Sequence, residues 1–176
     1  VPFCTYASTC GGCTLQNMSY EAQLVLKEKW IKDALLRIGG IEDPNVLTIM
    51  PMEEPFRYRN KAQFPVGRTG GDEKKEQACR VGFYKHKSNE VVNCETCMIQ
   101  TEAAERVAAA VRRWVKATKV PIYDPKTGTG VIRHVIVRTA VGSGEVMVIL
   151  VAADRRLPDT ELLLKDITKM LNALSE

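Results

Sequence analysis

The sequence contains no apolar run that approaches the roughly 18 to 20 residues that a membrane-spanning helix needs. Its N-terminus, VPFCTYAST, has neither the basic region nor the apolar region of a secretory signal peptide. Internal repeats and low-complexity tracts are also absent from the sequence. Of the 176 residues, 45% are hydrophobic, which is enough for a core and excludes a largely disordered chain. We therefore expect a monomer in the reducing cytoplasm, with no membrane partner.

Positive charge is unevenly distributed along the chain, although the formal net charge is only +4. Residues 57–87 contain nine Lys or Arg against three acidic residues, and residues 105–138 contain eight against two. Two basic stretches of this kind are typical of a phosphate-binding surface, although two ordinary solvated faces would give the same pattern.

The hydrophobic periodicity predicts helices and strands in alternation. The predicted helices cover residues 19–38, 101–116 and 159–174, and the predicted strands cover residues 46–50, 58–66, 80–84, 90–92, 131–139 and 145–152. Residues 67–77 are expected to form a long mobile hairpin loop, and the nearly continuous apolar character of 145–152 predicts a strand covered on both faces. This order predicts an α+β domain, with helices on one face of an antiparallel sheet and a cysteine-rich loop before it.

Alternation in the predicted strand 58–66 separates two faces. Tyr58, Ala62, Phe64 and Val66 fall on one side, and Arg59, Lys61 and Gln63 fall on the other. The first side is expected to enter the core, and the second to form a cationic, hydrogen-bonding face.

Cysteines provide the strongest chemical signal. Cys4, Cys10 and Cys13 form the pattern C-x5-C-G-G-C, and Cys94 and Cys97 follow far downstream. Four thiolates hold a 4Fe-4S cluster, and paired glycines let the backbone wrap closely around it. Alternatively, the pairs Cys10/Cys13 and Cys94/Cys97 would supply the four thiolate ligands of a tetrahedral zinc site. Spacing alone leaves both alternatives open.

Several motifs in fixed order resemble the bacterial RNA (uracil-5)-methyltransferases that methylate 23S ribosomal RNA. They are the Cys4–Gln16 stretch with Tyr20, Gln23 and Lys27, then YRNKAQF at 58–64, VGFY at 81–84 with Ser88, CMIQ at 97–100 and RHVIVR at 133–138. The resemblance implies that Cys4, Cys10, Cys13 and Cys97 bind a 4Fe-4S cluster. Cys94 departs from the family pattern, which keeps the zinc alternative open, and Cys79 is expected to be a small, partly buried residue.

The resemblance also implies a domain organisation. Residues 1–16 would be the cluster loop, closed by Cys97, and residues 17–176 would be a central RNA-binding domain. The family's catalytic domain, which binds S-adenosylmethionine, has no counterpart in this chain, because no G-x-G-like turn follows a strand. The chain is thus expected to be inactive by itself, with no catalytic and no S-adenosylmethionine-binding residue, although its parent would be an enzyme.

In the family that the sequence resembles, a cysteine thiolate attacks the face of the uracil ring, so the resemblance implies a reaction that requires an unstacked uracil. A domain that positions single-stranded RNA needs donors for phosphates and base edges, and the candidates are Arg57, Arg59, Lys61, Gln63, Arg133 and Arg138. Tyr58, Phe83 and Tyr84 could stack on bases, although the alternation favours Tyr58 in the core; His134 is a poor candidate for a base. The alternative function is a stand-alone RNA-binding module stabilised by zinc or a cluster.

Overall fold

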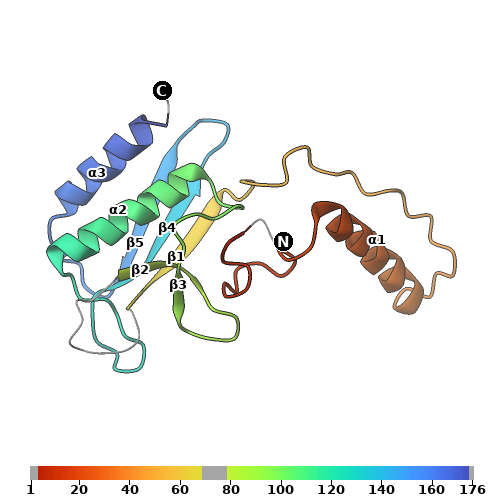
Figure 1. The fold of residues 1–176 in the computed structure, drawn as a ribbon, viewed down its shortest axis with the longest axis horizontal. Helices are drawn as coiled ribbons and strands as arrows, with labels where there is room; N and C mark the ends of the chain where they lie inside the picture. Colours follow the sequence, from red (N-terminus) through yellow and green to blue (C-terminus); the bar gives the residue numbers. More distant parts are fainter. Residues whose placement is uncertain (1–3, 69–78, 175–176) are drawn as a thin grey trace.

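The computed structural model describes residues 4–68 and 79–174. These residues form a five-stranded antiparallel sheet and three helices (Figure 1). The elements in chain order are α1 (Tyr20–Arg37), β1 (Lys61–Arg68), β2 (Cys79–Tyr84), β3 (Val91–Asn93), α2 (Glu102–Thr118), β4 (Ile132–Thr139), β5 (Val146–Ala152) and α3 (Thr160–Asn172). The sheet order is β3-β2-β1-β4-β5. The predicted α+β class and antiparallel sheet are confirmed.

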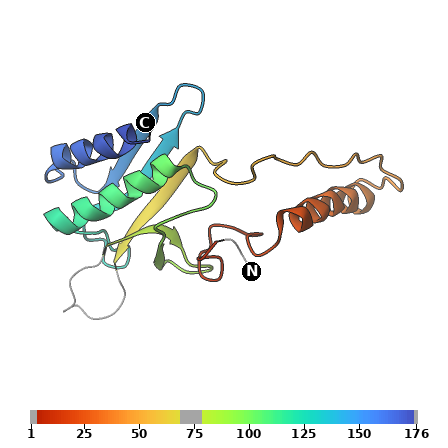
Figure 2. The ribbon, with the colours of Figure 1, turned by 45° about the horizontal axis from the view of Figure 1, so that its top comes forward.

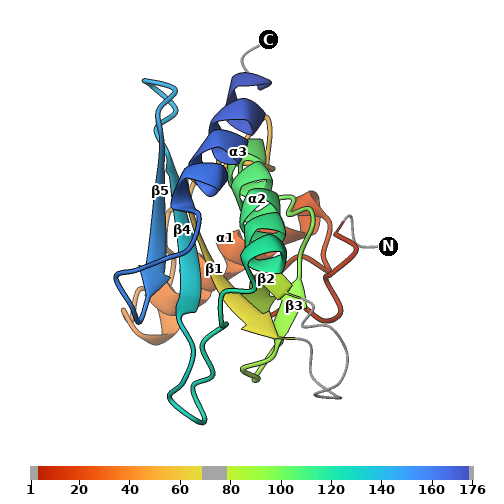
Figure 3. The ribbon, with the colours of Figure 1, turned by 90° about the vertical axis from the view of Figure 1, so that its left-hand side faces the viewer.

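The hydrophobic core lies between the sheet and two helices. Figures 2 and 3 show α2 and α3 on the same side of the sheet. The helix α2 begins after Thr101, whose hydroxyl accepts a hydrogen bond from the Ala104 N–H, and its Val107 and Val111 are buried against the sheet. Because fully burying a side chain of this size stabilises the fold by roughly 1.5–3 kcal/mol, this face of α2 holds the layers together.

The helix α1 stands apart from this core (Figures 1 and 2). It begins after Ser19, whose hydroxyl caps the Ala22 N–H, so the predicted helix 19–38 is confirmed, yet none of its 18 residues is fully buried. Two hydrogen bonds tie it to the following segment: the Tyr20 hydroxyl accepts from the Met52 N–H, and the Glu28 carboxylate accepts from the Ile49 N–H, each at 2.7 Å. No helix of the described residues is long and apolar enough to cross a membrane.

Two predictions before β1 are wrong. The described residues 46–50 form no strand, and β1 begins at Lys61 instead of residue 58. The Arg57 and Arg59 N–H groups donate to the carbonyls of Met98 and Ile99, and Arg57 has a left-handed backbone with φ of 53°. These hydrogen bonds hold residues 57–59 outside the sheet, so the strand alternation does not extend to Tyr58, which is 52% exposed instead of lying in the core.

The strand β5 also differs from its prediction. It is an edge strand, and its Met147 and Ile149 side chains are 58% and 39% exposed. Its other face packs on the core through Val146, Val148 and Leu150. The prediction that this strand is covered on both faces is therefore wrong, because α2 and α3 cover only one side of the sheet. The predicted loop 67–77 lies mainly outside the described residues.

Candidate functional site: a thiol-lined cavity beside an open sheet face

The cysteine-rich N-terminal loop is attached to the end of the β2–β3 hairpin by backbone contacts. Cys10 forms a β-bridge with Lys85, and the Gly11 N–H donates to the Tyr84 carbonyl at 2.8 Å. A Cβ atom at Gly11 would lie 3.0 Å from both this carbonyl oxygen and the His86 nitrogen. The close approach of the two backbones therefore favours glycine at the first glycine position of the CGGC motif.

Five of the six cysteines border one small cavity. They are Cys4, Cys10, Cys13, Cys94 and Cys97. All four ligands predicted for the cluster are therefore brought to one place, from two distant parts of the sequence. Within residues 4–68 and 79–174, no three His, Cys, Asp or Glu side chains are arranged to hold one metal ion. Metal binding by the four cysteines stays a prediction.

Burial and neighbouring charges act on these thiols in different directions. Burial, followed by the other cysteine charges, raises the pKa of Cys13, while the Arg59 guanidinium partly lowers it. Burial also raises the pKa of Cys97. A hydrogen bond from the Cys94 side chain lowers the pKa of Cys10 to about 6, and the same bond raises the pKa of Cys94.

Cys97 is held by a side chain from the first turn of α2. The Cys97 N–H donates to Glu105 Oε1 at 2.6 Å, and the same oxygen accepts from Arg57 Nη1 at 2.9 Å. Arg57 Nη1 also donates to the Gln100 carbonyl at 2.9 Å. Arg57, which was predicted to bind RNA, thus has structural partners. Sequence reasoning missed Glu105, because a first-turn glutamate is also an ordinary helix residue.

Arg59 and Phe83 border the cavity, although both were first considered for RNA. Phe83 packs on Phe64 with ring centroids 5.2 Å apart, so part of its surface is already covered. The Arg59 guanidinium places positive charge beside Cys13. Of the three aromatic candidates for stacking, Tyr58 and Tyr84 are the exposed ones.

The sheet face opposite α2 and α3 has a cationic end. Lys61 on β1 lies directly opposite Arg138 on β4, and both side chains are exposed. Gln63 lies opposite Ile136 in the same way. Like charges on directly opposite residues destabilise a sheet, and an anion bound between them removes that cost. This pair is therefore suited to a phosphate group.

Arg133 lies near the other end of β4. It is five residues from Arg138, or roughly 17 Å along a strand. Its guanidinium stacks over the Tyr123 ring, 4.2 Å from the centroid. Burial and the Arg133 charge lower the pKa of the neighbouring His134, which favours its neutral imidazole. Arg133 therefore does not join the Lys61–Arg138 pair.

Both the fold and the sequence relate this chain to RNA methyltransferases. The solved structure of the Pyrococcus abyssi tRNA (uracil-54, C5)-methyltransferase with S-adenosyl-L-homocysteine superposes with a TM-score of 0.65 and 26% identity, covering 87% of this chain and 34% of that one. No protein-family model matches the sequence.

Curated relatives are named as RNA methyltransferases that are themselves uncharacterized. The Clostridium tetani protein is 40% identical over 173 residues, covering 98% of this chain and 36% of the relative. The Caldanaerobacter subterraneus protein is 39% identical, and the Halalkalibacterium halodurans protein is 38% identical, with 37% and 35% of their lengths covered. This chain thus spans about a third of the relatives it matches, and it is a domain related to RNA methyltransferases.

Proposed function

We propose that the chain is the iron-sulfur and RNA-positioning domain of an S-adenosylmethionine-dependent RNA (uracil-5)-methyltransferase that acts on 23S ribosomal RNA. By itself it would not transfer methyl groups. The observation that carries this proposal is the convergence of Cys4, Cys10, Cys13 and Cys97 on one cavity, in a chain related to RNA methyltransferases. A lysine–arginine pair on the open sheet face supports the RNA role.

The donor set fits a 4Fe-4S cluster, because such a cluster takes one thiolate on each of its four irons. The bound cluster would supply a cross-link between the N-terminal loop and the segment around Cys97, neither of which has a large apolar core of its own. Gly11 and Gly12 let the loop fold closely around the site, and Arg59 contributes a positive charge to an otherwise anionic group. Glu105 holds the backbone of Cys97 in place.

The RNA role is assigned to the face that carries Lys61, Gln63 and Arg138. The two cations would bind phosphates, and the exposed Gln63 amide, which lies opposite Ile136 in the next pair along the same face, would reach a base edge. Phosphate contacts of this type position a strand without reading its sequence. The uracil itself would be bound and methylated by another part of the parent enzyme.

Metal analysis tests the cluster. Protein purified without oxygen should be brown and contain about four irons and four sulfides per chain. Cys97→Ala should bleach the protein, whereas Cys79→Ala should retain its iron, because Cys79 does not border the cavity. A colourless wild-type protein with one tightly bound zinc would contradict the cluster and support the zinc alternative.

Fluorescence anisotropy with a labelled hairpin of 23S ribosomal RNA tests the interface. The double variant Lys61→Ala/Arg138→Ala should weaken binding by roughly 1 to 3 kcal/mol and flatten the log–log salt dependence by about 0.7 per lost contact. A matched control, Lys165→Ala/Lys169→Ala, removes two exposed charges from α3, on the other side of the sheet. Equal losses in both variants would show that only net charge matters.

A further inference from the structure

A second groove lies between the first half of α1 and residues 49–58. Its space of about 320 Å³ falls at the lower end of the range for small-ligand sites. The walls are mostly apolar and include the aromatic rings of Tyr20, Phe56 and Tyr58. Gln16 and Ile99 border both this groove and the cysteine cavity, so the two sites are neighbours.

Motifs that carry the family resemblance meet at this groove. Tyr20, Gln23 and Lys27 follow one another on α1 at spacings of three and four residues, so they share one face of the helix. Tyr58 comes from the YRNKAQF motif, and Ile99 from the CMIQ motif. No residue of α1 is fully buried, so packing in the core does not account for this face.

The groove is formed before any ligand binds, because α1 already holds its opposite wall. The Tyr20 hydroxyl accepts from the Met52 N–H, and the Glu28 carboxylate accepts from the Ile49 N–H, each at 2.7 Å. These two hydrogen bonds fix the backbone of residues 49–52 beside the helix. A ligand would therefore not have to order this segment, which lowers the cost of binding.

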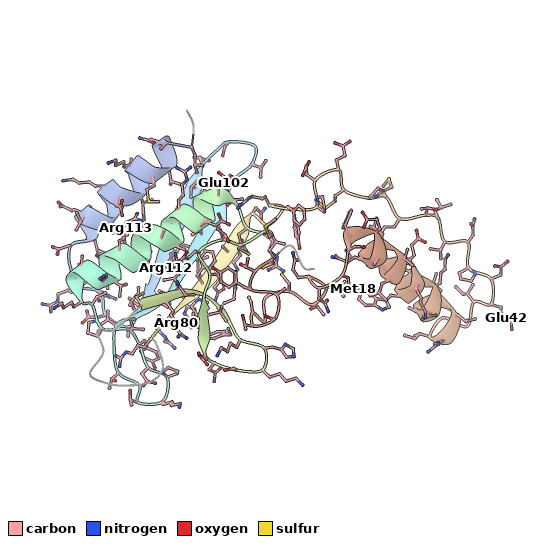
Figure 4. All side chains as sticks on the ribbon, in the orientation of Figure 1. Met18, Glu42, Arg80, Glu102, Arg112 and Arg113 are labelled. Atoms are coloured by element: carbon pink, nitrogen blue, oxygen red, sulfur yellow. The ribbon has the colours of Figure 1, made fainter. Side chains whose placement is uncertain are left out.

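Gln23 presents an acceptor at the groove. Its Nε2 donates to the Leu15 carbonyl and to the carbonyl of Met18, which is labelled in Figure 4, both at 3.2 Å. The two hydrogens of the amide are thus used within the protein, and the orientation of the side chain is fixed. Its Oε1 remains to accept a hydrogen bond, and amino groups on the edges of nucleobases are donors of the required kind.

Charge and exposure favour a nucleotide as the ligand. Among the described residues that line the groove, Lys27 is the only charged one. The Tyr58 side chain is 52% exposed, so its ring is accessible for stacking. Tyr58 is three residues from Lys61, at most about 11 Å along the chain. An RNA strand with a phosphate on the Lys61–Arg138 pair therefore has a neighbouring base within reach of this ring.

We propose that this groove binds one unstacked base of single-stranded RNA: Tyr58 stacks on the base, Gln23 Oε1 accepts a hydrogen bond from its edge, and Lys27 contacts a flanking phosphate. This inference rests on the proposed function, and it makes α1 part of the RNA-binding surface. The base bound here is not the uracil that is methylated, which the proposed function assigns to another part of the parent enzyme.

Two fluorescein-labelled oligomers separate base binding from phosphate binding: decauridylate, and an abasic RNA of the same length and backbone charge. In fluorescence anisotropy, the wild-type chain should bind decauridylate about tenfold more tightly, a difference within the range for one stacked base. Tyr58→Ala should remove this preference, while its affinity for the abasic oligomer and its salt dependence stay unchanged. Tyr58→Phe should retain the preference. Trp30→Ala is the matched control, because it removes an exposed ring of α1 that does not line the groove.

Lys27 is tested by its salt dependence. Lys27→Gln should weaken the binding of both oligomers and flatten the log–log salt dependence by about 0.7, as expected for one lost phosphate contact with a single strand. Lys29→Gln removes an exposed charge from the same helix that does not line the groove, and its slope should equal that of the wild type. Equal slopes in the two variants would remove Lys27 from the site.

The outcomes that would overturn the inference are distinguishable from failure of the proposed function. Equal wild-type affinity for the two oligomers, with binding lost in Lys61→Ala/Arg138→Ala, would overturn the base site and leave the phosphate interface; the groove would then be free for an apolar segment of the parent enzyme. Equal losses in Tyr58→Ala and Trp30→Ala would show that the general apolar surface of α1 binds RNA, and not this groove. A wild-type chain that binds neither oligomer nor the ribosomal hairpin would overturn the proposed RNA role, and this site with it.

Discussion

At the scale of single residues, Gln100 has an unusual environment. Its side chain is 1% exposed, and neither its Nε2 nor its Oε1 has a hydrogen-bond partner within the described parts of the chain. Its backbone is fully used, since the N–H donates to the Cys97 carbonyl and the carbonyl accepts from Arg57. A buried amide without partners costs about 1–3 kcal/mol.

Gln100→Met should therefore raise the free energy of unfolding by about 1 to 3 kcal/mol, because it keeps the volume and removes the unsatisfied amide. Urea denaturation followed by circular dichroism measures this change. Gln63→Met, at an exposed position on the open face, should alter stability by about 0.5 kcal/mol or less. A clear loss of stability in Gln100→Met would show that the amide has a partner, such as a buried water.

Cys79 provides a second test at this scale. Burial raises its pKa to about 11, although the Arg112 charge acts in the opposite direction. Because only the thiolate reacts, alkylation of Cys79 by iodoacetamide should be slow at pH 8 and rise about tenfold per pH unit up to its pKa. Peptide mapping of native and urea-unfolded protein measures the rates. Equal rates in the two states would contradict a raised pKa.

At the scale of elements, α1 and α2 are helices of different kinds. The helix α2 buries a continuous face, whereas α1 has a good N-cap but no buried residue. Each contains one of the two tryptophans of the sequence: Trp30 in α1 is 49% exposed and Trp114 in α2 is 3% exposed. The two side chains therefore report separately on the two environments.

Iodide should quench the fluorescence of Trp30 and leave that of Trp114 nearly unchanged, because a charged quencher does not enter the core. The variants Trp30→Phe and Trp114→Phe separate the two signals. The Trp114 emission should lie at shorter wavelength and shift on unfolding. Similar quenching constants in the two variants would mean that α1 is covered by other parts of the chain.

At the scale of the whole molecule, the core and the cysteine site are separable. The main cluster of buried side chains comes from β1, β2, β4, α2, α3 and the segment before β4, and it contains none of the five cavity cysteines. Metal would therefore organise the N-terminal loop without being needed for the sheet. This contrasts with zinc fingers, whose whole fold depends on the ion.

Removal of the metal by a chelator should increase hydrogen exchange in residues 4–13 and 94–97, while β1, β4 and α2 keep their protection. Mass spectrometry of peptic fragments measures this difference, with the metal-loaded protein as reference. Faster exchange throughout α2 after chelation would show that the core itself requires the metal.

Some features of this protein follow from its sequence alone. Hydrophobic periodicity predicted both α1 and α2, because the spacing of apolar residues is a local property, and the structure shows a side-chain cap at Ser19 and at Thr101. Alternation placed Ala62 and Phe64 in the core, and Lys61 and Gln63 outside it. The family resemblance selected four cysteines that the fold brings to one cavity.

Other features were decided only by tertiary structure. The periodicity of apolar residues shows which residues share a face, but it does not show what covers that face. For this reason β5 was predicted to be covered on both faces, although it lies at an open edge of the sheet. A positive charge in a basic stretch likewise does not reveal its partner. Arg57 pairs with Glu105, 48 residues away, Arg59 borders the cysteine cavity, and Lys61 meets Arg138 across the sheet. These three nearby cations have different roles because contacts between distant segments, and not local sequence, determine what each one faces.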